Sequence, residues 1–296
     1  MTAVLADLEA RIRAAFPALE YEHAVFNTYG EDNYVVVLDG RWIVRFPRSD
    51  GQRWRFIAEL SLLEALRSTA SVAVPHYEWV APEKAFGSYR LIEGREMTPP
   101  VYAALCPSKQ RAVLVQMGEF LSDLHALPEE TIRLPDGALQ RCWNSEASTA
   151  YYRGIRRAMI EPVVSTAWLA RFDAFHEAFA AIGSGVDRVC HGDLSDDHIL
   201  IASDGRLAGI IDFTDAAWGD PAIDFAYLWR MGEEAVDTVL LHYASAAADG
   251  GLKDRARWTF VRYLINQISY GARAKWNLSV EEALAELEPH LTWCGV

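Results

Sequence analysis

The stretch CHGDLSDDHIL, residues 190–200, gathers two histidines and three aspartates on a short segment that ends in an apolar run. So many ionisable side chains either decorate a solvated turn or form part of a site. The residues that follow, IASDGRLAGIIDF at 201–213, contain two apolar runs on either side of Asp204-Gly205. This dipeptide favours a tight hairpin turn because both of its residues tolerate positive φ angles. The sequence therefore predicts a β-hairpin that begins in the histidine- and aspartate-rich stretch.

The predicted hairpin brings another carboxylate back to the end of that stretch. With Asp204-Gly205 as the two central turn residues, strand pairing places His198 opposite Ile211. A loop one residue longer would place His198 opposite Asp212 itself. Spacing leaves both registers open, because a slip of one residue inverts the face of every side chain. In either register, Asp212 lies close to the loop that carries the HGD triplet.

This juxtaposition suits phosphoryl transfer. Asp193, on an irregular loop, can accept the proton of an attacking hydroxyl while Asp212 holds a Mg²⁺ ion that bridges phosphate oxygens. Protein kinases use H-R-D, four residues and Asn, and then D-F-G. Here the order is H-G-D, four residues, His198, and then IDFTD at 211–215. His198 is thus the second candidate metal ligand, although hard Mg²⁺ prefers oxygen ligands to an imidazole.

The paired motifs resemble the catalytic core of the aminoglycoside phosphotransferase family, antibiotic kinases with a protein-kinase-like fold. The segments that carry the likeness are HGDLSDDHIL at 191–200 and GIIDFTDAAWGDPAIDFAYL at 209–228. The likeness is nearest the 2″-aminoglycoside branch, in which an HxDxxxxH loop and an IDFGDA-type segment recur. It implies an α+β, bilobal protein-kinase-like fold with a small antiparallel-sheet N-lobe and a larger, mainly helical C-lobe. It also implies that His191 orients the loop and takes no part in the chemistry.

The periodicity of the rest of the chain changes in the order that such a fold requires. Residues 33–46 are two β-rich runs about Asp39-Gly40, and residues 54–66 repeat apolar side chains at helical spacing. Strand-like pieces follow at 76–81 and 88–94. Helical patterns then cover 111–127, 165–182, 221–249 and 254–288, with the 201–213 hairpin as the one β interruption. We therefore expect an N-lobe at 1–92 that binds nucleotide and a C-lobe at 93–296 that holds the catalytic loop and the acceptor.

The N-lobe offers candidates for nucleotide binding. Arg45 on the first hairpin and Glu59 on the helix after it stand in the order of the kinase lysine and its carboxylate partner. The family ordinarily has Lys in a strand such as FKFP, whereas this strand reads VRFP, and a guanidinium binds phosphate as a planar fork. Gly30 in TYGEDN stands where a loop would cover the phosphates, and the backbone from Arg90 to Ile92 is expected to meet the base. The implied cofactors are Mg²⁺ and ATP or GTP.

Acidic residues beyond the metal position are candidates for binding the acceptor. In the family such carboxylates pair with substrate ammonium groups, and an aromatic residue flanks that site. The positions that the resemblance assigns here are Asp215, Asp220, Glu233, Glu234 and Trp276. Asp220 has an alternative role as a helix cap before Pro221, and the two glutamates as a solvated face. Asp196 and Asp197 are expected to be solvated, and Asp224 to brace the C-lobe.

The composition limits the partners. The 296 residues contain 28 basic and 41 acidic side chains, for a formal net charge of -13. Such a surface repels nucleic-acid phosphates, and it favours a cationic small-molecule acceptor or simply keeps the protein soluble. No signal peptide, membrane span or CxxC pair is evident, so we expect a cytoplasmic protein without a disulfide framework. Nothing indicates an obligate protein partner.

Together these observations predict a Mg²⁺-dependent kinase that moves the γ-phosphate of a nucleoside triphosphate to a hydroxyl of a small cationic molecule such as an aminoglycoside, as in antibiotic resistance. A macrolide or small-metabolite kinase of the same fold is one alternative. A catalytically silent nucleotide-binding relative is another, because Arg45 and His198 stand where Lys and Asn are commoner. A metal-dependent hydrolase built on His191, Asp193 and His198 is disfavoured, since the sequence lacks a second group of histidine ligands.

Overall fold

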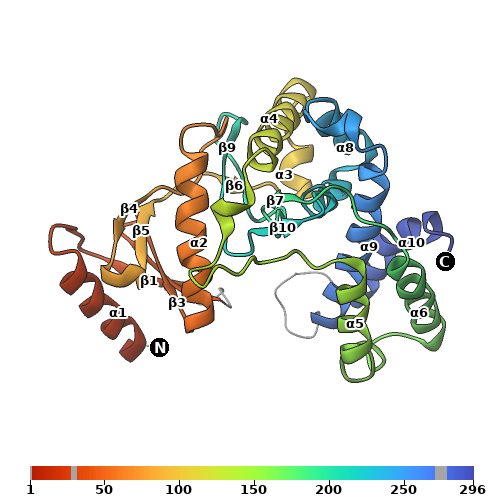
Figure 1. Ribbon diagram of the computed structural model, residues 1–296, viewed down its shortest axis with the longest axis horizontal. Helices are drawn as coiled ribbons and strands as arrows, with labels where there is room; N and C mark the ends of the chain where they lie inside the picture. Colours follow the sequence, from red (N-terminus) through yellow and green to blue (C-terminus); the bar gives the residue numbers. More distant parts are fainter. Residues whose placement is uncertain (1, 28–31, 271–278) are drawn as a thin grey trace.

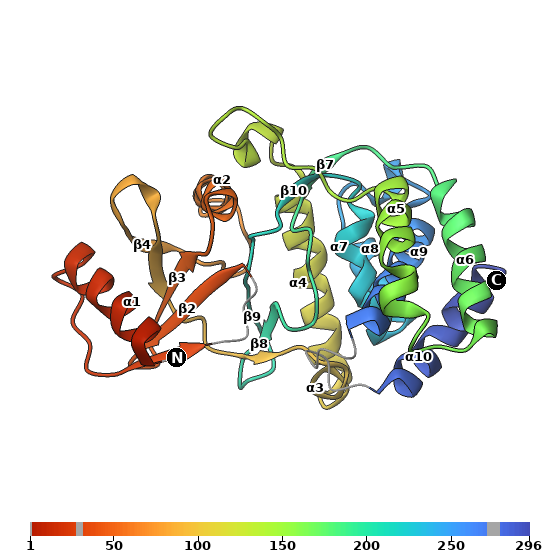
Figure 2. The ribbon, with the colours of Figure 1, turned by 90° about the horizontal axis from the view of Figure 1, so that it is seen from below.

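The computed structural model describes residues 2–27, 32–270 and 279–296. Figures 1 and 2 show the strands β1 to β5 with α1 and α2 at one end of the molecule and the long helices α5, α6, α9 and α10 at the other. Short strands of the second half of the chain lie between the two parts. This bilobal arrangement is the fold class that the sequence predicts. Within the described residues, no helix combines the length and apolar character needed to cross a membrane.

The N-lobe is built on an antiparallel sheet of five strands in the order β1-β2-β3-β5-β4. The strands are β1 Ala24–Asn27, β2 Asn33–Leu38, β3 Trp42–Pro47, β4 Tyr77–Val80 and β5 Gly87–Arg90. In the turn between β2 and β3, Asp39 and Gly40 have φ angles of 50° and 62°, as the dipeptide predicts. The strand pairing places Arg45 opposite Val35. The short helix η1, Pro82–Lys84, joins β4 to β5.

Two helices pack on this sheet. Helix α1 (Thr2–Ala15) is absent from the predicted elements, and its Leu8 and Ile12 are buried in the N-lobe core. Helix α2 (Asp50–Leu66) begins at Ser49, whose hydroxyl accepts the N–H of Gln52. The C-terminal half of α2 belongs to the core of the helical lobe, to which it contributes Leu62, Leu63 and Leu66. The second core therefore includes side chains from before residue 92.

The C-lobe is mainly helical, but its helices are more divided than the sequence suggests. They are α3 Pro99–Ala103, α4 Pro107–His125, α5 Ser145–Ile155, α6 Thr166–Ala180, α7 Ala222–Phe225, α8 Glu233–Leu241, α9 Leu252–Tyr270 and α10 Val280–Trp293. Shorter turns are η2 Glu129–Ile132, η3 Arg156–Ile160, η4 Ala226–Met231 and η5 Ala246–Ala248. The break between η4 and α8 falls at Gly232, whose φ angle of 96° ends one helix before the next begins.

The C-lobe also contains more strands than predicted. The hairpin consists of β8 Ile199–Ile201 and β9 Leu207–Ile210, and β6 Arg95–Glu96 pairs with β8. A separate pair is formed by β7 Arg188–Cys190 and β10 Ala217–Gly219. The expectation of one β interruption was wrong, because strands of two or three residues are too short to show an alternating pattern.

The hairpin register is the one that places His198 opposite Ile211. Ile199 pairs with Ile210, and the Ile211 N–H donates to the His198 carbonyl at 3.0 Å. The turn itself differs from the predicted two-residue loop, because Ala202 and Arg206 flank three loop residues. An irregularity between Leu200 and Ile201 compensates for the longer loop. The pairing expected from a two-residue turn therefore holds only at the open end of the hairpin, where His198 and Asp212 lie.

A buried histidine makes the C-lobe sensitive to acid. His176 on α6 is 2% exposed and stacks on Tyr152 with 3.9 Å between ring centroids. Burial, and then the Arg262 cation, lower the pKa of His176 to about 3. The folded state excludes a proton that the unfolded chain binds below about pH 6.5, so stability should fall as the pH decreases from 6.5 toward 3. This residue alone should contribute about 1.4 kcal/mol of lost unfolding free energy per pH unit.

Denaturant unfolding between pH 4.5 and 7.5 tests this expectation. The variant His176→Phe should flatten the dependence of the unfolding free energy on pH, since phenylalanine keeps the ring and cannot bind the proton. His76 is exposed, and His76→Phe provides the matched control. Equal slopes for the wild type and His176→Phe would show that other groups cause the acid sensitivity.

Candidate active site

The loop that carries the HGD triplet is anchored at its start by Asp224 on α7. The N–H of His191 donates to Asp224 Oδ2 at 2.7 Å, and the N–H of Gly192 donates to Oδ1 at 2.9 Å. Gly192 has a φ angle of 85°, and a Cβ there would lie 2.2 Å from the Asp215 carbonyl oxygen. Glycine is therefore required at this position. Asp224 therefore braces the loop that carries the HGD triplet.

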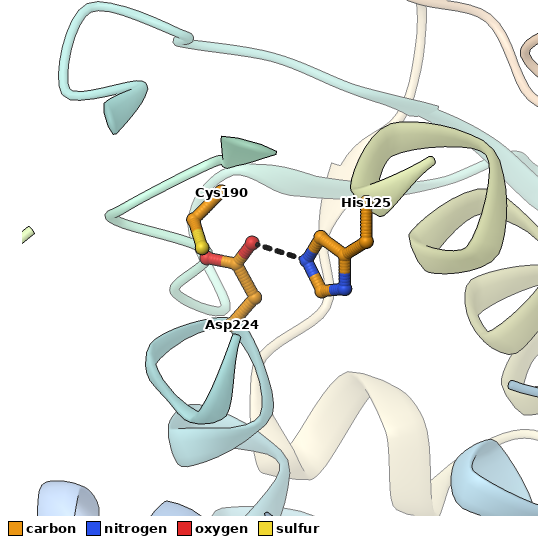
Figure 3. A group of neighbouring side chains, drawn as sticks. All are labelled: His125, Cys190 and Asp224. Carbon is orange, nitrogen blue, oxygen red and sulfur yellow. Dashed lines mark hydrogen bonds and ion pairs between the residues drawn. The ribbon is translucent and has the colours of Figure 1, made fainter. Parts of the chain in front are cut away.

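A buried histidine that the sequence analysis missed supports Asp224 (Figure 3). His125 Nε2 lies 3.0 Å from Asp224 Oδ2, and its Nδ1 lies 2.9 Å from the Tyr243 hydroxyl. An ionised carboxylate only accepts, so in a neutral imidazole Nε2 donates to Asp224 and Nδ1 accepts from Tyr243. Cys190 lies beside them. The Asp224 carboxylate, the Cys190 thiol and the His125 imidazole are close enough together to contact one ion. Because Asp224 already binds two backbone amides, this group is a structural anchor. The available signal was a histidine within the apolar pattern of α4.

His191 ties the loop to the hairpin. It is fully buried, and its Nε2 lies 3.0 Å from the Ile211 carbonyl oxygen, to which it donates. Nδ1 then accepts the Asp193 N–H at 3.4 Å. Burial lowers the pKa of His191 to about 4, so the ring is neutral near pH 7. This geometry fits an orienting role.

The carboxylate of Asp193 is open to a substrate. Its side chain is 38% exposed and faces His198, with 3.7 Å between Oδ2 and Nδ1. Burial raises the pKa of Asp193 to about 6, although His198 acts in the opposite direction. A carboxylate with a raised pKa is a stronger proton acceptor than an ordinary one. The position and the basicity of Asp193 both suit a general base.

Asp212 is held by a cation from the other lobe. Arg45 Nη2 lies 2.8 Å from Asp212 Oδ1, while its Nη1 lies 2.7 Å from Glu59 Oε1. Burial disfavours the charged carboxylate, but Arg45 and then His198 outweigh it, so the pKa of Asp212 is far below its usual range. Asp212 also has a φ angle of 64°, a strained conformation for a residue other than glycine. The structure thus joins Asp212 to two N-lobe residues that lie far from it in the sequence.

His198 faces Asp212 across a short gap. Its Nδ1 donates to the Asp193 carbonyl at 2.7 Å, and its Nε2 lies 3.8 Å from Asp212 Oδ2 and 3.9 Å from Asp197 Oδ2. Burial disfavours the imidazolium, but the carboxylates of Asp197, Asp212 and Asp193 outweigh it and raise the pKa of His198 to about 9. The surrounding carboxylates therefore favour a positive charge at this position.

The same donor atoms fit a divalent cation in place of that proton. Two ligand atoms that each lie about 2.1 Å from one Mg²⁺ ion are at most about 4.2 Å apart. The distance of 3.8 Å between His198 Nε2 and Asp212 Oδ2 lies between the separations of about 3.0 Å and about 4.2 Å that neighbouring and opposite ligands have in an octahedral Mg²⁺ site, so a small side-chain adjustment would let both atoms bind one ion. The bond from Nδ1 to a backbone carbonyl leaves Nε2 as the ligand atom after the proton is lost. Asp212 would supply the hard oxygen ligand and His198 the weaker nitrogen ligand.

Of the residues predicted to bind nucleotide, Arg45 and Glu59 lie beside Asp212, whereas Arg90 and Ile92 make other contacts. Arg90 is exposed, pairs with Glu78 at 2.9 Å and stacks over the Trp42 ring. The N–H of Leu91 donates to the Arg41 carbonyl, so that amide is engaged. Ile92 packs against Gly209 of the hairpin, as its Cγ2 lies 2.9 Å from where a Cβ would stand. Gly30 lies outside the described residues, as does Trp276 of the acceptor candidates.

Asp220 does not lie in the site, contrary to the sequence prediction. Strand β7 runs toward the catalytic loop and β10 runs away from it, since Ala217 pairs with Cys190 and Gly219 with Arg188. Asp220 follows the far end of β10. Its carboxylate accepts from Arg255 at 2.6 and 3.1 Å and from the Ala222 N–H at 3.0 Å. It caps α7, which is the alternative role, and it also neutralises the partly buried Arg255 cation.

The other predicted acids, Asp215, Glu233 and Glu234, differ in their surroundings. Asp215 is half-exposed and pairs with Arg55 of α2 at 3.1 Å. Glu233 is exposed and pairs with Lys253 at 2.7 Å, as a solvated face would. Glu234 lines a cavity of about 620 Å³ between α3, α4, η4 and α8. Of the predicted acceptor contacts, Asp215 and Glu234 remain candidates.

Asp196 was wrongly predicted to be solvated. It is 3% exposed, and Arg230 of η4 lies 2.6 Å from its Oδ2. Arg230 also pairs with Glu286 of α10 at 3.0 Å. This ion pair compensates for the burial of the carboxylate. Asp197, by contrast, has a side chain that is 44% exposed.

Known proteins share this sequence pattern and this architecture. Residues 25–261 match the family described as the phosphotransferase enzyme family. The uncharacterized protein YcbJ of Bacillus subtilis (strain 168) is 28% identical in an alignment of 251 residues that covers 76% of this chain and 76% of the relative. Viomycin phosphotransferase of Streptomyces vinaceus is 29% identical over 174 residues, covering 56% of this chain and 58% of the relative.

Solved structures share the fold over nearly the whole chain. The GDP and kanamycin complex of APH(2″)-IIia superposes with a TM-score of 0.77 at 24% identity, covering 97% of this chain and 98% of the other. The macrolide 2′-phosphotransferase MphH of Brachybacterium faecium has a TM-score of 0.63 at 23% identity, covering 98% and 99%. At this level of identity, the likeness concerns the fold.

Proposed function

Because this chain belongs to the phosphotransferase enzyme family, we propose that it is a Mg²⁺-dependent kinase that phosphorylates a hydroxyl group of a small cationic molecule. The phosphate donor is ATP or GTP. The observation that carries the proposal is the convergence of Asp193, His198 and Asp212 at the open end of the hairpin, with Arg45 and Glu59 behind Asp212. A proton acceptor thus lies beside a candidate metal site, as phosphoryl transfer requires.

Each residue has a separate task in this mechanism. Asp193 orients the acceptor hydroxyl and takes its proton as the new O–P bond forms and the bond from the γ-phosphorus to the β–γ bridging oxygen breaks, which releases the nucleoside diphosphate. His198 Nε2 and Asp212 Oδ2 would hold Mg²⁺, which when bound neutralises charge on the phosphate oxygens. Arg45 keeps Asp212 ionised and in place, and Glu59 supports Arg45. The buried contacts of His191 and Asp224 hold the loop so that Asp193 faces the acceptor.

An aminoglycoside is the proposed acceptor. The formal charge of -13 and the half-exposed carboxylates of Asp197 and Asp215 near Asp193 favour a molecule with several ammonium groups. A relative with the same fold is known as a complex with kanamycin. A second candidate acceptor is a macrolide, because a macrolide 2′-phosphotransferase shares the fold over nearly the whole chain.

A panel of acceptors tests the proposal. Purified enzyme is incubated with Mg²⁺ and either ATP or GTP. Each reaction also contains one acceptor, which is kanamycin, gentamicin, a macrolide, viomycin or an amino sugar. Mass spectrometry should detect one added phosphoryl group on an aminoglycoside, and chelation of Mg²⁺ should abolish the product. The matched control is the Asp193→Asn protein. Phosphorylation of the macrolide alone would establish the second candidate, while no product with any acceptor would leave a nucleotide-binding protein without this activity.

A further inference from the structure

Thr214 closes a hydrogen-bonded triangle with Arg45 and Asp212. Arg45 Nη2 donates both to Thr214 Oγ1 and to Asp212 Oδ1, the latter at 2.8 Å. The Thr214 hydroxyl in turn donates to Asp212 Oδ1 at 2.7 Å. Thr214 and Arg45 are 6% and 3% exposed, so water does not compete strongly for these bonds. The corresponding position in the IDFGDA-type segment is glycine, which has no hydroxyl.

The triangle provides an acceptor for each N–H group of Arg45 Nη2. Nη2 has two N–H groups, and Thr214 and Asp212 accept one each. Nη1 serves Glu59 at 2.7 Å on the opposite side. The planar fork of arginine spans these acceptors, whereas lysine ends in a single nitrogen and cannot. A buried N–H without an acceptor is costly, so the hydroxyl at 214 suits an arginine at 45 in particular.

The triangle also restricts how Asp212 is presented. Both donors bind Oδ1, while Oδ2 faces His198 Nε2 at 3.8 Å. Rotation of the carboxylate would break two buried hydrogen bonds at once. The strained backbone, with a φ angle of 64°, directs the side chain into this position. One oxygen is therefore reserved for the protein and one for a ligand.

We propose that Thr214 is a positioning residue that works as a coupled pair with Arg45: together they hold the Asp212 carboxylate so that Oδ2 faces the metal. This inference rests on the proposed function, since it takes Asp212 and His198 as the metal ligands. It adds that arginine in place of the usual lysine is functional here because Thr214 replaces glycine. It concerns the assembly of the metal site before any nucleotide is bound.

The first test removes the hydroxyl at constant shape. Thr214→Val should weaken the binding of Mn²⁺ alone, measured by electron paramagnetic resonance, by about tenfold. Thr214→Ser keeps the hydroxyl and should bind Mn²⁺ almost as the wild type does. Thr149 is 1% exposed and its hydroxyl donates to the His176 carbonyl, so Thr149→Val is the matched control and should not change Mn²⁺ binding. Equal losses for Thr214→Val and Thr214→Ser would assign the effect to packing and overturn the proposal.

The second test measures the coupling. Arg45→Lys alone should also weaken Mn²⁺ binding, but in the Arg45→Lys background the further loss from Thr214→Val should be smaller than in the wild type, because the direct bond from the hydroxyl to Asp212 Oδ1 is then the main contact that is lost. Two effects that multiply independently would overturn the pairing. If Thr214→Val does not fold, Thr214→Ala removes the hydroxyl without adding a methyl group to a new position.

These measurements use neither an acceptor nor turnover. If the Arg45 and Thr214 substitutions have coupled effects on Mn²⁺ binding but no acceptor is phosphorylated, the proposed reaction is rejected and the inference about Thr214 is kept. Independent effects in an active enzyme would reject the inference alone.

Discussion

Asparagine in place of Asp193 should lower kcat for acceptor phosphorylation by about 10²- to 10⁴-fold. The substitution keeps the size of the side chain and removes the group that accepts the proton of the attacking hydroxyl. The affinity for Mg²⁺ and nucleotide should fall far less than kcat, because the Asp193 backbone carbonyl that orients His198 at 2.7 Å is retained and the carboxylate lies farther away, at 3.7 Å. Steady-state kinetics with the identified acceptor and a nucleotide titration separate the two effects.

The neighbouring Asp197 provides a matched control for this experiment. Its Oδ2 lies 3.9 Å from His198 Nε2, so it is also a carboxylate close to the metal site. Asp197→Asn removes the same charge but no proton acceptor in the proposed mechanism, and it should cause a much smaller loss of kcat. Comparable losses in both variants would show that the rate depends on the local negative charge and would contradict a general base at Asp193.

Asparagine in place of Asp212 should weaken the binding of Mg²⁺-nucleotide by about 10²-fold. The amide keeps an oxygen that can accept from Arg45 and Thr214, but it has no charge with which to hold a divalent cation. It also leaves the buried Arg45 with Glu59 as its remaining carboxylate partner within the described residues. Calorimetric titration of nucleotide with and without Mg²⁺ measures the change, and thermal unfolding shows whether the variant is folded.

Asp215→Asn is the matched control in the same loop. Asp215 pairs with Arg55 at 3.1 Å and is assigned no contact with the metal. Its variant should bind Mg²⁺-nucleotide almost as tightly as the wild type. An unchanged metal titration for Asp212→Asn would remove Asp212 from the metal site, whatever its effect on kcat.

The parts of the site that could be predicted are those encoded over short distances. The HGD triplet, His198 and Asp212 lie within one loop and one hairpin, and the turn at Asp204-Gly205 is recognisable from local backbone preferences. The spacing left two registers open, and the structure has the one that places His198 opposite Ile211, because a bulge offsets the longer turn. Helix α5 and strands β6, β7 and β10 were missed, and the strands are too short to show periodicity.

By itself, the sequence determined the order of the chemical groups and the two-lobe fold, because motif spacing and periodicity are properties of neighbouring residues. Only the tertiary structure decided which acids are available. Asp196 and Asp220 are engaged by Arg230 and Arg255, which lie on other helices. Likewise, Arg45 reaches Thr214 from 169 residues away in the chain. Such partners are chosen by the packing of distant elements, and a buried charge is stable only where that packing provides one.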